Sequence, residues 1–268
     1  MSTHGYESGR LDLPFVGIST FGKRPYQPDW SNLEADIAIL GAPFDAGTQW
    51  RSGARFGPRG VRDASTLFSF GHAGAYDHED NRVYLPGSVR MVDMGDADII
   101  HTDTQKSHAN IEMGVRAALA ANALPVTIGG DHSVNIPCIN AFDDQGDFHI
   151  LQIDAHLDFV DERHGVRVGH GNPMRRAAEK PYVTGLTQMG IRNVSSTAKE
   201  GYEAARAMGF EKVSAATAAT TPRITKAIVR WAIWSQICAA VVGIWLSAKR
   251  ASLIFSIVGA EVSGRVFP

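Results

Sequence analysis

Short apolar runs alternate with helix-like patterns between residues 35 and 213, and Gly, Asp, Pro or Asn bounds each of them. The apolar runs predict strands at Ala35–Leu40, Val89–Val92, Pro125–Ile128, His149–Ile153 and Thr187–Ile191. The stretches between them predict helices, most clearly at Asp103–Ala121 and Thr197–Met208. This alternation predicts an α/β protein with a mostly parallel sheet covered on both faces and a ligand site beyond the carboxyl ends of its strands.

Two of the predicted strands end in unusually polar segments. The run LPVTIGGDHS passes from a strand through two glycines to His132, and the run HILQIDAHLDF passes from a strand into Asp154, His156 and Asp158. Residues two apart in extended chain point to one side, so the three polar groups of the second run would share a space about 7 Å across. The sequence therefore predicts one polar site where these two strands end.

Carboxylates and imidazoles without a nearby thiolate are ligands that suit Mn²⁺ and similar divalent ions. Asp154 could bridge two ions, with His132 and Asp158 on one ion and His156 on the other. Two such ions could share a hydroxide formed at neutral pH, which is a nucleophile for an unreactive carbon centre. The alternative is structural, because Asp-x-His-x-Asp also caps helices and forms surface ion networks.

His170 lies in the glycine-flanked segment VGHGNP, shortly after this polar cluster. The ordinary pKa of imidazole lies near neutrality, so His170 could carry a proton to a leaving amine. A loop histidine that only hydrogen-bonds to the backbone is the alternative reading.

Other kinds of site find no support in the sequence. Neither GxxxxGK[ST] nor a GxGxxG after a strand occurs, so nucleotide binding is not expected and the following glycines indicate a loop: Gly47, Gly53, Gly57 and Gly60. Cys138 lies among apolar residues and is expected to be buried, and no Ser-His-Asp or Cys-His pattern is recognisable.

The overall composition is that of an ordinary globular protein of 268 residues, with 26 basic and 28 acidic side chains. The near-neutral charge gives no reason to expect a nucleic-acid partner. The two cysteines lie far apart without a zinc-binding pattern, and the first ten residues lack the apolar core of a secretion signal. We therefore expect a cytoplasmic protein.

The composition changes near residue 215. Residues 216–268 contain six basic and one acidic side chain and no histidine, which divides the chain into a domain at 1–215 and an atypical apolar, basic tail at 216–268. The segment WAIWSQICAAVVGIWLS (Trp231–Ser247) is nearly long enough to span a membrane, but it contains polar residues. A membrane segment is not favoured, and a buried helix or a poorly folded tail are the other readings.

Four segments together resemble the ureohydrolase (arginase/agmatinase) family: GAPFDAGTQWRSGARFGPRGVRDAS, IGGDHS, DAHLD and GHGNPMRRA. The resemblance covers residues 11–213 and is stronger to agmatinases and related guanidino-acid hydrolases than to arginases. It implies a three-layer α/β/α fold, two Mn²⁺ ions and a homo-oligomer. It also implies hydrolysis of a small guanidino substrate, foremost agmatine to putrescine and urea, as in polyamine biosynthesis.

In this resemblance, the family's metal ligands match His132, Asp154, His156 and Asp158. A metal-bound hydroxide would attack the guanidinium carbon, with Asp158 orienting it and His170 assisting proton transfer to the amine. Another guanidino substrate, such as guanidinobutyrate, is an alternative.

The family also has two further metal-binding aspartates and a later glutamate, but this chain contains no aspartate after Asp161. Glu261 lies in a short stretch that only superficially matches the glutamate motif. A shifted reading frame would explain why resemblance and acidic composition end together. Fewer than two ions would then bind, with one held by His132, Asp154 and Asp158, and the chain could be a catalytically impaired remnant of the family.

Overall fold

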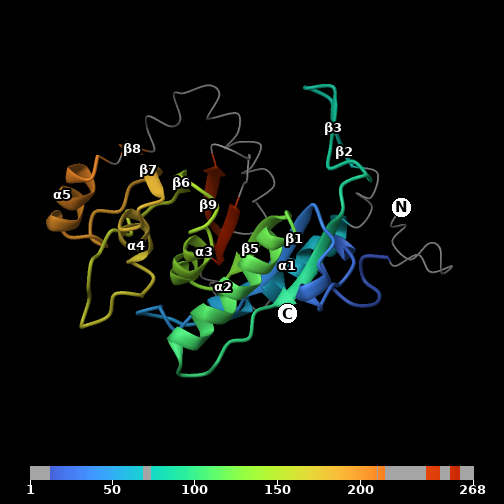
Figure 1. The fold of residues 1–268 in the computed structure, drawn as a ribbon, viewed down its shortest axis with the longest axis horizontal. Coiled ribbons are helices and arrows are strands. Elements are labelled where there is room, and N and C mark those ends of the chain that lie inside the picture. Colours follow the sequence, from blue (N-terminus) through green and yellow to red (C-terminus); the bar gives the residue numbers. More distant parts are fainter. Residues whose placement is uncertain (1–12, 69–73, 210, 215–239, 248–253, 260–268) are drawn as a thin grey trace, which may run out of the picture.

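The computed structural model describes residues 13–68, 74–209, 211–214, 240–247 and 254–259 (Figure 1). The strands are β1 (Ile37–Ala42), β2 (Ala75–Asp77), β3 (Arg82–Tyr84), β4 (Met91–Asp96), β5 (Leu124–Gly129), β6 (Phe148–Ile153), β7 (Val183–Ile191), β8 (Glu211–Ser214), β9 (Ala240–Ser247) and β10 (Ile254–Gly259). The α-helices are α1 (Gly57–Ser65), α2 (Thr104–Ala120), α3 (Asn135–Asn140), α4 (Pro173–Ala178) and α5 (Lys199–Ala207). The predicted strands and the two predicted helices are therefore present, with ends shifted by a few residues.

Eight strands form one sheet in the order β4-β1-β5-β10-β9-β6-β7-β8. All of them run in the same direction except β9, which is antiparallel to both of its neighbours, β10 and β6. The mostly parallel α/β sheet is thus confirmed. Strands β1, β5, β6 and β7 all end at one edge, where the polar segments predicted from the sequence begin.

Helices cover both faces of this sheet. Leu40 and Gly41 are consecutive in β1, so the Leu40 side chain and a Cβ built at Gly41 would point to opposite faces. A Cβ at Gly114 of α2 would lie 2.7 Å from Leu40, whereas a Cβ at Gly41 would lie 3.0 Å from Arg62 of α1. Helices α2 and α1 therefore pack on opposite faces, which gives the three layers.

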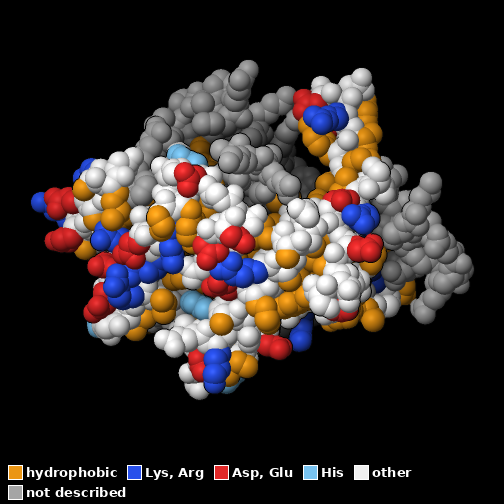
Figure 2. Space-filling model, in the orientation of Figure 1, with side chains coloured by type: hydrophobic (Ala, Val, Ile, Leu, Met, Phe, Trp, Pro, Cys, Tyr) orange, Lys and Arg blue, Asp and Glu red, His pale blue; other side chains and the backbone are white. Residues whose placement is uncertain are grey.

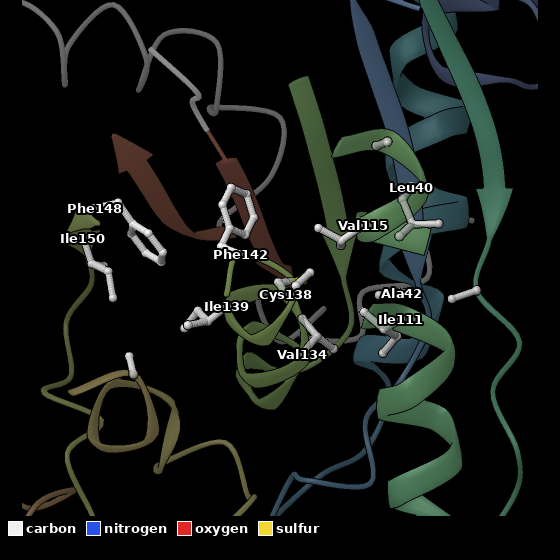
Figure 3. Close-up of a cluster of buried hydrophobic side chains, with 14 of the residues drawn as sticks. Leu40, Ala42, Ile111, Val115, Val134, Cys138, Ile139, Phe142, Phe148 and Ile150 are labelled. Carbon is white, nitrogen blue, oxygen red and sulfur yellow. The ribbon is translucent and has the colours of Figure 1, made fainter. Parts of the chain in front are cut away.

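The core lies where α2 and α3 meet the sheet (Figure 3). Ile111 and Val115 of α2 belong to the same buried cluster as Leu40, and Phe142 packs edge to face on Phe148 with ring centroids 5.5 Å apart. Cys138 is fully buried in this cluster, as predicted, and burial raises the pKa of its thiol to about 12. The thiol is therefore protonated and serves as a packing group.

The predicted loop in the glycine-rich stretch near residue 57 is partly wrong. Gly57 and Gly60 lie in α1 and not in a loop, although Gly47 and Gly53 precede it in irregular chain. Pro58 suits the first turn of a helix because its missing N–H has no intrahelical partner there. Arg62 then fixes the helix to the sheet through a buried ion pair with Asp93.

Two strands of the described part of the tail lie at the centre of the sheet, between β5 and β6. The alternative of a buried helix is therefore wrong for Ala240–Ser247, which forms β9. The rest of that segment, 231–239, and Glu261 lie outside the described residues. Both strands are rich in β-branched residues, which favour extended chain. Among the described residues, no helix has the length and apolar character needed to cross a membrane.

The structure also contains a small hairpin that the sequence patterns did not predict. Strands β2 and β3 pair in antiparallel fashion and project from the body of the molecule (Figure 1). The Asp77 carboxylate accepts hydrogen bonds from the N–H groups of Glu79 and Asp80 and so closes the turn. On the face shown in Figure 2, acidic and basic side chains are interspersed over the described surface.

Candidate metal centre

The segment after β5 is held in place by backbone contacts with the segment after β1. A Cβ at Gly130 would lie 2.1 Å from the carbonyl oxygen of Phe44, so only glycine allows this approach. The next residue, Asp131, donates its N–H to the same oxygen at 2.7 Å. Its carboxylate accepts from the N–H of Ser133 at 2.7 Å and so caps the 3-10 turn His132–Val134. This turn points the His132 ring at the site.

The segment after β6 brings in two carboxylates by tight local turns. Asp154 accepts a hydrogen bond from the N–H of His156 at 2.9 Å through its Oδ1 atom. Asp158 adopts a left-handed backbone, with φ of +50°, which Asp tolerates better than most residues. This turn directs Asp158 back toward His132.

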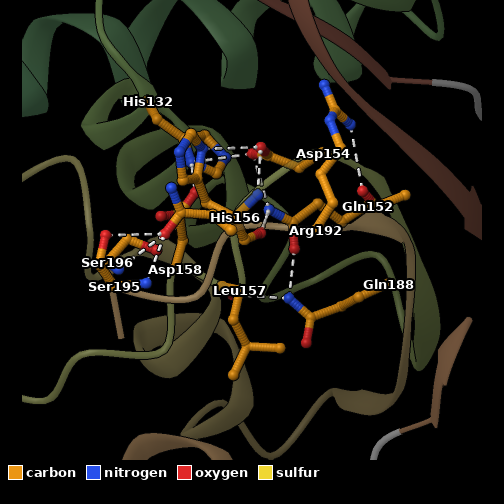
Figure 4. A network of polar contacts seen from close by, with 12 residues as sticks. His132, Gln152, Asp154, His156, Leu157, Asp158, Gln188, Arg192, Ser195 and Ser196 are labelled. Carbon is orange, nitrogen blue, oxygen red and sulfur yellow. Dashed lines mark hydrogen bonds and ion pairs between the residues drawn. The ribbon is translucent and has the colours of Figure 1, made fainter. Parts of the chain in front are cut away.

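Three side chains converge as the sequence predicts. One potential ligand atom from each of His132, Asp154 and Asp158 lies within 4.8 Å of the other two, and all three residues are buried (Figure 4). Nδ1 of His132 is 2.6 Å from Oδ2 of Asp158 and 3.8 Å from Oδ2 of Asp154. One buried nitrogen and two buried carboxylates therefore surround one point.

The charges of this cluster favour a cation. Within the described residues, neither Asp154 nor Asp158 forms an ion pair with Lys or Arg. Burial raises the pKa of the Asp158 carboxyl, and the Asp154 charge adds to that rise. Burial also acts to raise the pKa of Asp154, but hydrogen bonding to His156 and the His132 charge outweigh it and lower that pKa. Two close, buried carboxylates compensated only by imidazoles fit a divalent cation.

His156 stands outside the group of three. Its Nδ1 atom is 3.3 Å from Oδ1 of Asp154, whereas His132 approaches Oδ2 of the same carboxylate. The side chain is 42% exposed, in contrast to 6% for His132. The hydrogen bond with Asp154 raises the pKa of His156. The structure thus places His156 at the edge of the cluster, on the other side of Asp154.

His170 lies in a loop that contacts the segments after β1 and β5. Its N–H donates to the carbonyl oxygen of Gly47 at 3.1 Å, and its ring interacts electrostatically with Asp131. Gly47 in turn donates its N–H to Asp131 at 2.7 Å. His170 is therefore positioned beside the segment that carries His132, without being one of the three clustered residues.

A cavity of about 500 Å³ lies among the described residues, and none of the clustered side chains lines it. Its lining includes residues 159–163, which directly follow Asp158, and residues at the start of α5. Arg163 lines it and donates to Gln49 at 2.6 Å and to the carbonyl oxygen of Ser196 at 3.2 Å. Arg163 thus connects its own loop with the segments that carry Gln49 and Ser196.

Two residues that contact this site were not identified from the sequence. Gln152 in β6 donates to Oδ2 of Asp154 at 3.0 Å, and Gln188 in β7 donates to Gln152 (Figure 4). The signal was present, because each glutamine is a polar residue inside an otherwise apolar predicted strand.

Comparisons with known proteins agree on one family, the arginase family. The arginase-family model matches residues 35–233, a range that begins later and ends later than the resemblance over residues 11–213 found in the sequence. The human mitochondrial guanidino acid hydrolase is 33% identical over 203 residues, which cover 75% of this chain and 55% of that protein. Chicken mitochondrial agmatinase is 31% identical over 205 residues, covering 75% of this chain and 57% of the relative.

A solved structure shows the same fold. Proclavaminate amidinohydrolase from Streptomyces clavuligerus superposes with a TM-score of 0.68 at 28% identity, covering 81% of this chain and 71% of that one. The chain spans little more than half the length of the two curated relatives.

Proposed function

Because the chain belongs to the arginase family, we propose that it is a metal-dependent amidinohydrolase that cleaves a guanidino compound to urea and an amine. The observation that carries this proposal is the convergence of His132, Asp154 and Asp158 within 4.8 Å. These donors would hold a divalent ion, and their oxygen and nitrogen chemistry suits Mn²⁺ and similar divalent ions. When bound, such an ion supplies a water acidified enough to be a nucleophile near neutral pH.

The donor atoms of the described residues are sufficient to hold one ion but not a second. His156 and Oδ1 of Asp154 are the donors on the far side of the cluster, and the chain has no aspartate after Asp161 to complete a second set. A second ion would then lack the negative charge that offsets repulsion between two divalent cations. The proposal therefore rests on a single ion.

The remaining residues would act on the substrate and on protons. His170 is held by Gly47, and we assign to it the transfer of a proton to the nitrogen of the leaving amine. Asp158, fixed by His132, would orient the attacking water as well as bind the ion. Hydrolysis then breaks one C–N bond of the guanidinium, and the carbon leaves as urea.

Agmatine is the first substrate to consider, and a guanidino acid such as guanidinobutyrate is the second. Both have a guanidinium group, but agmatine ends in an ammonium group and guanidinobutyrate in a carboxylate. The relatives at about one-third identity include proteins named for each class, so they support both.

A second candidate is a remnant of the family that binds metal without turnover. The absence of any aspartate after Asp161 favours it, because a single ion acidifies water less than a pair does and leaves the guanidinium less well oriented. Such a chain would still bind Mn²⁺.

Urea release tests the proposal directly. The full chain, loaded with Mn²⁺, is incubated with agmatine, guanidinobutyrate and arginine, and urea is measured over time. We expect release from one of the first two that is lost in Asp158→Asn, an isosteric change that keeps the turn but removes a ligand charge. Asp147→Asn, which alters an exposed aspartate just before β6, should retain activity. Mn²⁺ binding without urea release from any of them would favour the remnant.

A further inference from the structure

Two glutamines are buried side by side at the end of the sheet where the metal cluster lies. Gln152 is 0% exposed and Gln188 is 1% exposed, and they are directly paired in neighbouring parallel strands. The preceding residues on the same faces, Ile150 and Leu186, are buried and apolar. A buried amide is costly unless its hydrogen bonds are satisfied, so an apolar residue would be the simpler choice at both positions.

The hydrogen bonds of these amides have one consistent direction. Gln188 donates from Nε2 to the carbonyl oxygen of Leu157 at 2.6 Å and also to Oε1 of Gln152. Gln152 donates from Nε2 to Oδ2 of Asp154 at 3.0 Å (Figure 4). A backbone carbonyl and a carboxylate only accept, so each glutamine must turn its NH₂ group toward them. The orientation of both amides is thereby fixed.

Gln188 and Gln152 form a hydrogen-bonded relay that ends on Oδ2 of Asp154. Oδ2 of Asp154 is the atom that approaches Nδ1 of His132, at 3.8 Å, while Oδ1 is engaged by His156. A neutral amide holds the carboxylate without cancelling its charge, whereas Arg or Lys at this place would compete with a cation. The relay therefore orients Asp154 and leaves its charge available.

We propose that Gln152 is a positioning residue that aligns Asp154 for binding of the divalent ion, and that Gln188 holds Gln152 in the required orientation. This inference rests on the proposed metal site and deepens it. It assigns a role to two residues that do not touch the substrate or the ion.

Mn²⁺ titration of the full chain by calorimetry tests the role of Gln152. The variant Gln152→Met keeps the approximate size of the side chain but removes the donor. We expect its Kd for Mn²⁺ to rise about 10- to 100-fold over wild type, as is usual when the partner of a metal ligand is lost. Gln188→Met should weaken binding in the same direction by a smaller factor, since it acts through Gln152.

Matched variants separate positioning from loss of structure. Gln145→Met removes an exposed glutamine whose amide also donates to an aspartate, Asp144, and should leave the Kd unchanged. The melting temperature of each metal-free variant shows whether it folds. If Gln152→Met does not fold, the Kd of Gln188→Met tests the proposal instead.

Two outcomes would overturn the relay in different ways. A Kd for folded Gln152→Met within twofold of wild type would remove the positioning role and leave the metal site intact. Failure of the wild-type chain itself to bind Mn²⁺ would remove the metal site and the relay together.

Discussion

Single residues at the site show local conformations that their chemistry requires. Asp158 stands in the left-handed region at φ +50°, a conformation that costs of order 1 kcal/mol for a non-glycine residue. Its carbonyl oxygen accepts from the N–H of Met174 at the start of α4, so the turn is fixed by the next helix. Backbone strain is thus located at the carboxylate that contacts His132.

His108 gives a prediction at the same scale. Its Nε2 atom is buried without a hydrogen-bond partner among the described residues, and its ring packs on Phe44 with centroids 5.0 Å apart. Burial lowers the pKa of His108 to about 4. The folded state therefore disfavours the charged ring, so its contribution to stability is complete above pH 6.5 and is lost as the pH falls toward 4.

Urea unfolding at pH 7.5 and at pH 5.0 measures this effect. On lowering the pH from 7.5 to 5.0, the free energy of unfolding of wild type should fall by about 2 kcal/mol more than that of His108→Leu, because leucine cannot be protonated. His101→Leu alters an exposed histidine nearby and should behave like wild type. Equal losses in wild type and His108→Leu would show that His108 does not titrate in this way.

Among the elements, α1 depends on a buried ion pair for its place on the sheet. Arg62 contacts both oxygens of Asp93 in β4, from Nε at 2.8 Å and from Nη2 at 3.0 Å, and Asp93 is 1% exposed. Removal of the guanidinium would leave a buried carboxylate without its cation. We expect Arg62→Met to lower the free energy of unfolding by about 3–5 kcal/mol.

Chemical denaturation checks this value against a surface pair. Arg90→Met removes an arginine that is 58% exposed and pairs with Glu34 and Asp36, and its loss should cost less than about 1 kcal/mol. If Arg62→Met were no more destabilising than Arg90→Met, α1 would be held by other contacts.

Some elements could be predicted from the sequence and others could not, for physical reasons. The strands β1, β5 and β6 are short apolar runs followed by Gly or Asp, and α2 begins at Thr104, directly after Asp103, whose carboxylate caps the N–H of Lys106. Helix α1 was missed because its glycines suggest a loop, while its stability comes from Arg62 and distant Asp93. Such tertiary contacts are invisible to local patterns.

In the whole molecule, parallel topology explains why the site could be located. Because strands that run in one direction end at one edge, His132 after β5 and Asp158 after β6 are expected to meet. Nδ1 of His132 and Oδ2 of Asp158 lie 2.6 Å apart. The sequence could not show that His156 would face the opposite oxygen of Asp154. It also did not show that β10 and β9 would lie between β5 and β6, because pairing between distant segments leaves no local signal.

The central claim is that the chain holds one divalent ion between His132, Asp154 and Asp158. Elemental analysis of the full chain after Mn²⁺ loading and removal of free metal measures this directly. We expect about one Mn²⁺ per chain, and none after the change Asp158→Asn. No bound metal in the wild-type chain would contradict the site, and two ions per chain would contradict the exclusion of His156 from the ligand set.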